Sequence, residues 1–375
     1  MKTVCYYISE YGYGHATRSI AIIRKLLELN SDINVIICHS HAMKLIQQSL
    51  SKTYKKRIIF HEVKTDIGYF LRLDSLEPDI EKINMEWLNY EDSLPHMIQS
   101  EIDFLDKYEV SLIISDISPL AFEVGDAIGV QTMGVSNFTW YTAYKDLIPD
   151  EKLVSLENAY QKMDYFIALA GQQEENWGRK AKYDFLFYSR ETNQVEVNRI
   201  RNEINPDNDK TIVFVGIGMG LHIDLSDNAF WNDEQCVFVV SNNLNVSRSN
   251  IHSIPKEYTE SQNYIAASDV IVTKAGWGTL SEAINNNRRL VIIDRRSLNE
   301  DKNTITYVTK YYSNSRVISF GDLKSINFTV EYQMTKRNPE ILDKNVVNDI
   351  AIKMIEIMDY SARSQVSSST SEVLI

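Results

Sequence analysis

The first forty residues alternate apolar runs with a glycine-rich turn and an amphipathic segment, and this order limits the possible folds most. Residues 3–8 (TVCYYI) are apolar and lead to the turn with Gly12 and Gly14. Residues 17–29 then place apolar side chains at helical spacing, and residues 33–38 (INVIIC) form a second apolar run. The order predicts a strand–helix–strand unit. Because both apolar runs are nearly continuous, it favours a parallel sheet covered by helices on both faces.

The same pattern recurs along the chain. Further elements are expected at these positions: strands at 110–115, 130–135, 164–169, 211–215, 236–240, 269–273 and 290–293, and helices at 119–128, 279–286 and 343–358. A length of 375 residues suits two domains of this kind. We therefore predict an α/β protein with two domains.

Changes in composition predict where the domains divide. Residues 1–170 are expected to form the first domain, with an acidic and aromatic insertion on its rim at 61–108. The polar segment 171–210 is expected to be a linker, and 211–340 the second domain. The serine-rich tail 363–375 is expected to be disordered, because it lacks the apolar residues needed to bury a core.

Charge and cysteine content exclude several classes of protein. Lys plus Arg number 39 and Asp plus Glu number 51, so the net charge is −12, which repels phosphate backbones and excludes a nucleic-acid-coating protein. The three cysteines, Cys5, Cys38 and Cys236, are too scattered for a disulfide framework or zinc cluster, and Cys5 and Cys38, which lie in apolar runs, are expected to be buried thiols. Without a signal-peptide pattern or an apolar stretch of ~20 residues, we expect a cytoplasmic protein. Peripheral contact with a membrane stays open.

Half of the 14 glycines lie in three short turns that follow expected strands. They are Gly12, Gly14, Gly216, Gly218, Gly220, Gly276 and Gly278. Such turns bring backbone N–H groups and a helix N-terminus to the carboxyl edge of a parallel sheet, where anions bind. Thr17 occupies the last glycine position of the dinucleotide fingerprint, and the sequence has no P-loop motif. The turns therefore favour a different anion-binding cleft between the two domains.

His15 and Asp116 are the candidate catalytic pair. His15 follows the first glycine turn, where an imidazole can accept a proton near neutral pH. Asp116 follows the apolar run 110–115, so it lies at the carboxyl end of another strand and can orient the histidine. The alternatives are a His15 that caps or packs below its turn, and an Asp116 that caps the helix starting near Pro119.

The segment TKAGWGTLSEA at 273–283 is the candidate nucleotide site. Lys274 and free N–H groups suit a diphosphate, and the Glu282 carboxylate suits a ribose diol. The alternative is structural, because Thr279 and Glu282 also match a helix capping box.

Three stretches together resemble the GT-B-fold glycosyltransferases. They are GYGHATRS at 12–19, SDISPLAFEVGDAIGVQTMGVSNFTW at 115–140, and TKAGWGTLSEA at 273–283. The resemblance is to inverting families that include UDP-glycosyltransferases and the peptidoglycan N-acetylglucosaminyltransferase, and to the glycosyltransferase-like module of plant arabinokinases. It implies two Rossmann-like domains with parallel sheets facing a central cleft, and a helix at 341–362 that crosses back to the first domain.

The resemblance also implies a reaction. A hexose or N-acetylhexosamine would be transferred from a nucleotide sugar to a hydroxyl of a sugar, a lipid-linked sugar or a small molecule, with inversion at the anomeric carbon. The expected nucleotide sugar is a UDP-sugar. His15 would be the base and Asp116 its partner, with the diphosphate held by N–H groups and Lys274 rather than by a metal or further cofactor. The implied donor-site residues are Gly14, Gly216, Gly218, Lys274, Ala275, Gly276, Gly278, Thr279, Glu282 and Glu300. The implied acceptor-side residues are Tyr13, Asn137 and Trp140.

The sequence departs from the family pattern in two places. Asn287-Arg288-Arg289 stands where the family usually has Gly-x-Pro, and asparagine tolerates the left-handed conformation needed after a helix. Asn299-Glu300-Asp301 replaces the Asp-Gln pair that binds sugar hydroxyls in many members of the family, so the identity of the transferred sugar stays open.

Two other functions stay open. One is a nucleotide-sugar hydrolase in which the same histidine activates water, and the other is a catalytically silent subunit that binds a sugar nucleotide. The aromatic side chains of 61–108, namely Tyr69, Phe70, Trp87 and Tyr90, favour the transferase, because they suit stacking on an acceptor.

Overall fold

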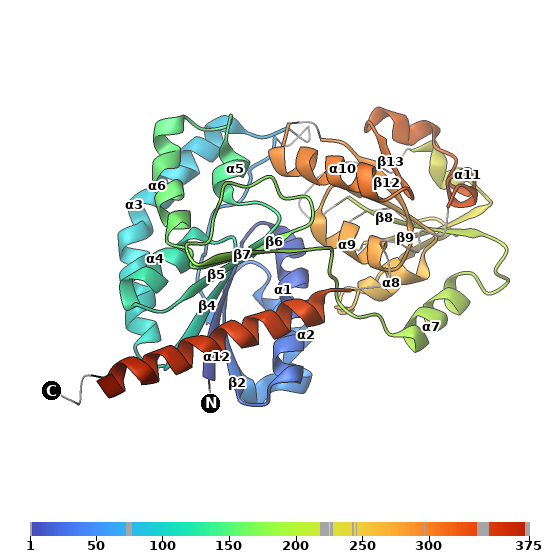
Figure 1. Cartoon of the computed structure of the whole chain (residues 1–375). Coiled ribbons are helices and arrows are strands. Elements are labelled where there is room, and N and C mark those ends of the chain that lie inside the picture. The colour runs from blue at the N-terminus through green and yellow to red at the C-terminus, as the bar shows by residue number, and fades with distance from the viewer. Residues whose placement is uncertain are drawn as a thin grey trace.

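The computed structural model describes residues 2–72, 77–217, 225, 228–241, 244, 246–295, 297–335 and 345–371. Within these residues the strands form two parallel sheets, one in each half of the chain (Figure 1). This confirms the predicted α/β fold class. The near-continuous apolar runs explain the arrangement, because a parallel strand is buried on both faces of its sheet.

The first sheet has the strand order β3-β2-β1-β4-β5-β6-β7. Its strands are β1 (Lys2–Ile8), β2 (Ile33–His39), β3 (Ile58–Glu62), β4 (Val110–Asp116), β5 (Thr132–Ser136), β6 (Tyr165–Leu169) and β7 (Ala181–Phe185). The helices of this half are α1 (Gly12–Leu29), α2 (Met43–Tyr54), α3 (Ile80–Leu105), α4 (Pro119–Ile128), α5 (Trp140–Tyr144) and α6 (Asp150–Gln161), with a 3₁₀ turn η1 (Lys55–Arg57).

The second sheet has the order β10-β9-β8-β11-β12-β13. Its strands are β8 (Thr211–Gly216), β9 (Cys236–Val240), β10 (Ile251–Ser253), β11 (Val270–Lys274), β12 (Arg289–Ile293) and β13 (Ser315–Ile318). The helices that follow in this half are α7 (Gln194–Ile204), α8 (Gln262–Ala267), α9 (Trp277–Asn285), α10 (Asn299–Tyr311), α11 (Phe328–Gln333) and α12 (Val347–Ser371), with 3₁₀ turns η2 (Ala229–Asn232) and η3 (Gly321–Ser325).

Both sheets have a topological switch point that sets the position of the site. In the first sheet β1 pairs with β2 on one side and β4 on the other, and in the second β8 pairs with β9 and β11. Connections leave such a pair of central strands toward opposite faces, which opens a crevice at their carboxyl ends. The glycine turns after β1 and β11 lie at these ends, and so does Gly216 at the end of β8; Gly218 and Gly220 lie outside the described residues.

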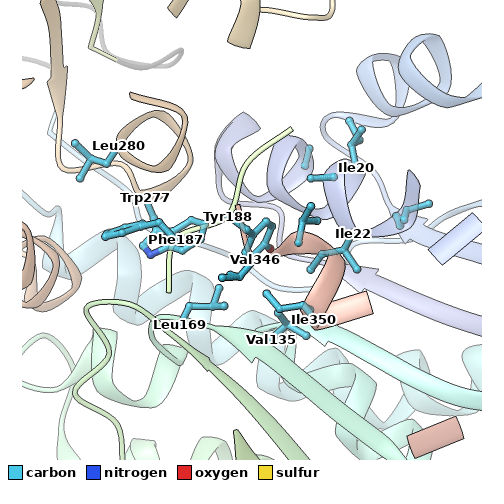
Figure 2. Packing of buried hydrophobic residues seen from close by; sticks show 14 of the residues in the cluster. Ile20, Ile22, Val135, Leu169, Phe187, Tyr188, Trp277, Leu280, Val346 and Ile350 are labelled. Carbon is cyan, nitrogen blue, oxygen red and sulfur yellow. The ribbon is translucent and has the colours of Figure 1, made fainter. Parts of the chain in front are cut away.

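An apolar core joins the two halves. The rings of Phe187 and Tyr188 pack against Trp277 with centroids 5.2 and 5.1 Å apart, and Val346 and Ile350 belong to the same buried cluster (Figure 2). From there α12 runs along the first half and packs against α1 (Figure 1). The division of the chain into separate domains stays a prediction.

Three expected segments differ in detail from the structure. The stretch 61–108 is a layer of the fold rather than a rim insertion, because α3 packs against α4 over the sheet. The segment 171–210 contains β7 of the first sheet and α7, which packs against α8. Residues 363–371 continue helix α12, since the serine-rich segment has no Gly or Pro to end a helix; residues 372–375 lie outside the described part.

Smaller expectations are confirmed. Asn287 follows α9 with a φ of 53°, as its position after a helix requires. Cys5 and Cys38 are buried free thiols as expected, and Cys236 is also buried and free. Within the described residues, none of the helices has the length and apolar character needed to cross a membrane.

Candidate active site

A cavity of ≈ 690 Å³ lies between the two halves. The glycine turn of α1 lines one side, and the turn of α9 lines the other. The two turns approach closely, since a Cβ on Gly278 would lie 3.3 Å from the carbonyl oxygen of Gly14. Two helix N-termini therefore border the same space, where their free N–H groups and dipoles favour an anion.

His15 lies on the first turn of α1, because the helix begins at Gly12 and not after the turn as the sequence suggested. Gly12 has a φ of +71°, a conformation that side chains rarely adopt, so glycine permits this early start. No side chain caps the N-terminus of α1, which leaves His15 free of a capping role. The imidazole instead lines the cavity.

His15 and Asp116 contact each other directly. Strands β1 and β4 are neighbours in register, with Ile8 opposite Asp116, so the two carboxyl ends coincide. The imidazole Nδ1 lies 2.9 Å from the Asp116 Oδ1. We assign Nδ1–H as the donor to this carboxylate, which leaves Nε2 for a ligand in the cavity. Burial lowers the pKa of His15 and outweighs the opposing effect of Asp116, so the ring favours its neutral form.

Asp116 does not cap α4, so that alternative is wrong. The N-cap of α4 is Ser118, and the Asp116 carboxylate is bound by Arg18 Nε at 2.7 Å, by Arg18 Nη2 and by the Ser19 hydroxyl at 3.2 Å. Burial raises the pKa of Asp116, but the Arg18 guanidinium and the contact with His15 outweigh this and lower it, so the carboxylate is ionised. Ile117, the next residue, has a φ of 58°, a strained conformation for a β-branched residue that turns the chain sharply after the aspartate.

The glycine turn of the candidate nucleotide site follows β11. Lys274, Ala275, Gly276, Gly278 and Thr279 all line the cavity, and so does Gly216 at the end of β8. The Lys274 ammonium lies 5.4 Å from the ring centre of Tyr11. Within the described residues no carboxylate lies at ion-pair distance from this ammonium, so its charge is available to an anionic ligand. Gly218 lies outside the described residues.

Glu282 is not part of a capping box, because α9 begins at Trp277 and Thr279 is already inside the helix. Its Oε1 instead accepts two bonds from the Arg190 guanidinium, at 3.0 Å from Nε and 2.9 Å from Nη2. Arg190 also donates to the Thr259 carbonyl and the Ser261 hydroxyl. The arginine therefore fixes the carboxylate at the cavity wall through one oxygen, and Oε2 is the oxygen that can meet a ligand.

Glu300 lines the cavity, whereas its neighbour Asp301 does not. Arg295 binds both oxygens of the fully buried Asp301, at 2.5 Å for Nε–Oδ2, and lies 3.4 Å from Glu300 Oε1. Burial, together with the nearby Asp301 carboxylate, raises the pKa of Glu300 to about 7. A carboxyl group that changes charge near neutral pH thus faces the ligand space.

The expected acceptor-side residues separate into two groups. Tyr13 and Asn137 line the cavity, but Trp140 is 1% exposed and donates its Nε1–H to Asp66 at 3.0 Å inside the first half. Among the aromatic residues of 61–108, Trp87 and Tyr90 are buried in the same apolar cluster. Tyr69 is the one of the four that lines the cavity. The idea of an exposed aromatic acceptor surface is therefore wrong for Trp87 and Tyr90.

The structure offers little for a metal ion. Across the described ranges, no group of three or more His, Cys, Asp or Glu side chains is arranged to hold one. The chain has an Asp-x-Asp triplet, Asp207-Asn208-Asp209, but it lies exposed in the loop between α7 and β8 and does not line the cavity.

The sequence reasoning missed two arginines that organise the site. Arg18 is 4% exposed and binds Asp116, and Arg190 is 2% exposed and binds Glu282. Arg18 follows His15 by three residues, so its helical spacing was a usable signal. Arg190 lies in the polar segment 171–210, which has no local pattern that points to a partner 92 residues away.

Comparisons with known proteins agree with this architecture. No protein-family model matches the chain. L-arabinokinase of Arabidopsis thaliana is 23% identical over 308 residues, which cover 79% of this chain and 28% of that protein. The chain thus spans less than a third of the length of this relative.

Solved structures cover the chain almost completely. UGT89C1 of Arabidopsis thaliana, solved with UDP, has a TM-score of 0.60 at 11% identity and covers 100% of both chains. UGT2 of Phytolacca americana, solved with UDP-2fluoro-glucose and pterostilbene, has a TM-score of 0.58 at 12% identity over 99% of this chain and 100% of its own. The glycosyltransferase SnogD of Streptomyces nogalater has 0.57 at 11%, over 96% and 100%. The chain therefore has the GT-B fold, with two Rossmann-like sheets on either side of a cleft.

Proposed function

We propose that this chain is a glycosyltransferase that moves a sugar from a UDP-sugar to an acceptor hydroxyl with inversion at the anomeric carbon. The single observation that carries the proposal is the His15–Asp116 pair, 2.9 Å apart, on the wall of a cavity that two glycine turns also line. A fold shared with structures solved with UDP and UDP-2fluoro-glucose supports the donor class.

The reaction follows from the charges around the cavity. The neutral His15 Nε2 takes the proton of the acceptor hydroxyl as its oxygen forms a bond to the anomeric carbon. The bond from that carbon to the β-phosphate oxygen breaks, and UDP leaves with the electron pair. Asp116 steadies the imidazolium that forms. Lys274 and the N–H groups at the start of α9 meet the charge that develops on the leaving diphosphate.

The donor is held mainly by the second half of the chain. Glu282 Oε2 is available for the ribose hydroxyls, because Arg190 occupies Oε1. Glu300 borders the same space and is our candidate for binding sugar hydroxyls. The acceptor would enter on the side of Tyr13, Asn137 and Tyr69.

A nucleotide-sugar hydrolase is the second candidate function, and one observation favours it. The burial of Trp87 and Tyr90 removes much of the aromatic surface that favoured an acceptor over water. Each sugar nucleotide should therefore be incubated with the protein alone and with a panel of hydroxyl acceptors, while UDP and free sugar are both measured.

UDP release that requires an acceptor supports transfer. Without acceptor, release of free sugar and UDP in equal amounts identifies the hydrolase. A protein that binds UDP but forms no UDP from any sugar nucleotide, with or without acceptor, would be a silent subunit. In the transferase, His15→Ala should lower turnover by about 10²–10⁴ while UDP affinity stays near wild type, because the base contacts the acceptor and not the nucleotide. An unimpaired His15→Ala protein would refute the assignment of the base.

A further inference from the structure

Arg18 contacts both members of the catalytic pair, and all three nitrogens of its guanidinium form bonds there. Nε and Nη2 bind the two oxygens of Asp116, and Nη1 donates to Asn137 Oδ1 at 2.8 Å. Nη2 also lies 3.0 Å from the Ser136 hydroxyl and 3.0 Å from His15 Nδ1. The group that holds the aspartate therefore also touches the histidine.

We propose that Arg18 is the positioning residue of this pair: its fork fixes the Asp116 carboxylate against His15, and its charge keeps the imidazole neutral before the acceptor arrives. The inference rests on the proposed function, since it assigns a task beside the same histidine. Arg18 borders the cavity, but each of its three guanidinium nitrogens already donates to Asp116, Asn137 or Ser136, so it acts through these neighbours.

The charge around His15 supports this role. The imidazole faces Asp116 from β4, Arg18 from its own helix α1 and His39 from the end of β2, while Glu10, Lys274 and Glu300 border the same cavity. Burial lowers the pKa of His15 most, and the Arg18 guanidinium lowers it further. Asp116 raises it, but that carboxylate is shared with the arginine. A carboxylate already paired with a cation attracts an imidazolium less strongly.

The segment 273–283, which we assign to the sugar nucleotide, also covers Arg18 through Trp277. The centre of the Trp277 ring lies 5.4 Å from the Arg18 guanidinium carbon, and Trp277 is the first residue of α9. Its indole Nε1–H donates to the Ala170 carbonyl at 3.0 Å, and the Phe187 and Tyr188 rings pack against the indole (Figure 2). Trp277 therefore excludes water from Arg18 and links the donor turn to the catalytic pair.

The test is an NMR titration of His15, which needs no turnover. Imidazole signals of the ligand-free protein are followed from pH 5 to 9, and His15→Gln identifies the His15 signal. Arg18→Met should raise the titration midpoint of His15 by about one pH unit or more, because the repelling cation is gone and Asp116 is freed for the imidazole. The acid limb of the turnover profile should move upward with it.

Matched variants separate this role from simple destabilisation. Arg201→Met removes another arginine–aspartate pair, 2.9 Å from Asp269 and outside the cavity, and should leave the His15 midpoint unchanged. Arg18→Lys keeps a charge without the fork, so the midpoint should stay near wild type while turnover falls about tenfold or more. This variant also serves if Arg18→Met does not fold.

An unchanged or lowered midpoint in Arg18→Met, or full turnover in Arg18→Lys, would overturn the role of Arg18. An equal shift in Arg201→Met would do the same. Failure of the proposed function is distinguishable, because it would appear as free sugar formed without an acceptor, as no cleavage of the sugar nucleotide, or as sugar transfer that His15→Ala leaves intact, whatever the titration shows.

Discussion

We assign two tasks to Glu282, and substitution can separate them. Its Oε1 is the carboxylate partner of Arg190, and both side chains are buried, at 5% and 2% exposure. Its Oε2 is the oxygen that we assign to the ribose of the donor. Glu282→Ala should remove both, whereas Glu282→Gln keeps an amide oxygen that can accept from Arg190 but carries no charge.

The structure sets the size of each effect. Removing one partner of a buried ion pair costs about 3–5 kcal/mol, so Glu282→Ala should unfold at clearly lower urea concentration. Glu282→Gln should lose less, about 1–2 kcal/mol, because the hydrogen bonds to Arg190 persist. Both variants lose charge-assisted bonds to the ribose worth about 1.5–3 kcal/mol, which corresponds to roughly a 10- to 150-fold weaker UDP affinity.

Urea denaturation followed by tryptophan fluorescence and calorimetric titration with UDP measure the two effects. Glu331→Ala is the matched control, because it removes the partner of Arg289, 2.7 Å away and buried, without touching the cavity. It should lose stability and keep its UDP affinity. Wild-type affinity in Glu282→Gln would refute the ribose assignment, and wild-type stability in Glu282→Ala would refute the ion-pair reasoning.

Two further predictions concern the cavity wall. The folded pKa of Glu300, about 7, lies above its ordinary value of 4.5, so the folded protein retains a proton that the unfolded chain releases, and stability falls as pH rises through this window. Glu300→Gln cannot ionise and should therefore raise the melting temperature of the ligand-free protein at pH 8 more than at pH 5; an equal difference at both would show that Glu300 does not titrate there. Gly278→Ala should lower the melting temperature, because its Cβ would lie 3.3 Å from Gly14 O and overpacking of about 1–3 kcal/mol exceeds the helix-propensity gain of about 1 kcal/mol. A higher melting temperature would mean that the two turns separate freely.

The sequence by itself determined the local elements and the chemistry of the turns. Apolar runs such as 3–8 and 110–115 became β1 and β4, because a strand buried on both faces needs no partner information to be recognised. Asp116 and Lys274 at strand ends, and His15 in the glycine turn after another strand, were visible for the same reason. Their resemblance to GT-B motifs extended this to the arrangement of the two sheets.

The sequence proposed that His15 and Asp116 act as a pair, but only the tertiary structure decided that they touch and which other residues meet them. His15 and Asp116 are 101 positions apart and touch because β4 lies next to β1, and the order of strands is a non-local choice that no periodicity encodes. The same holds for Arg190, whose partner Glu282 comes from another helix. The stretch 61–108 shows the limit from the other side, because its acidic composition suggested an exposed insertion. Trp87 and Tyr90 on α3 are buried instead, since one face of a charged amphipathic helix can still cover a sheet.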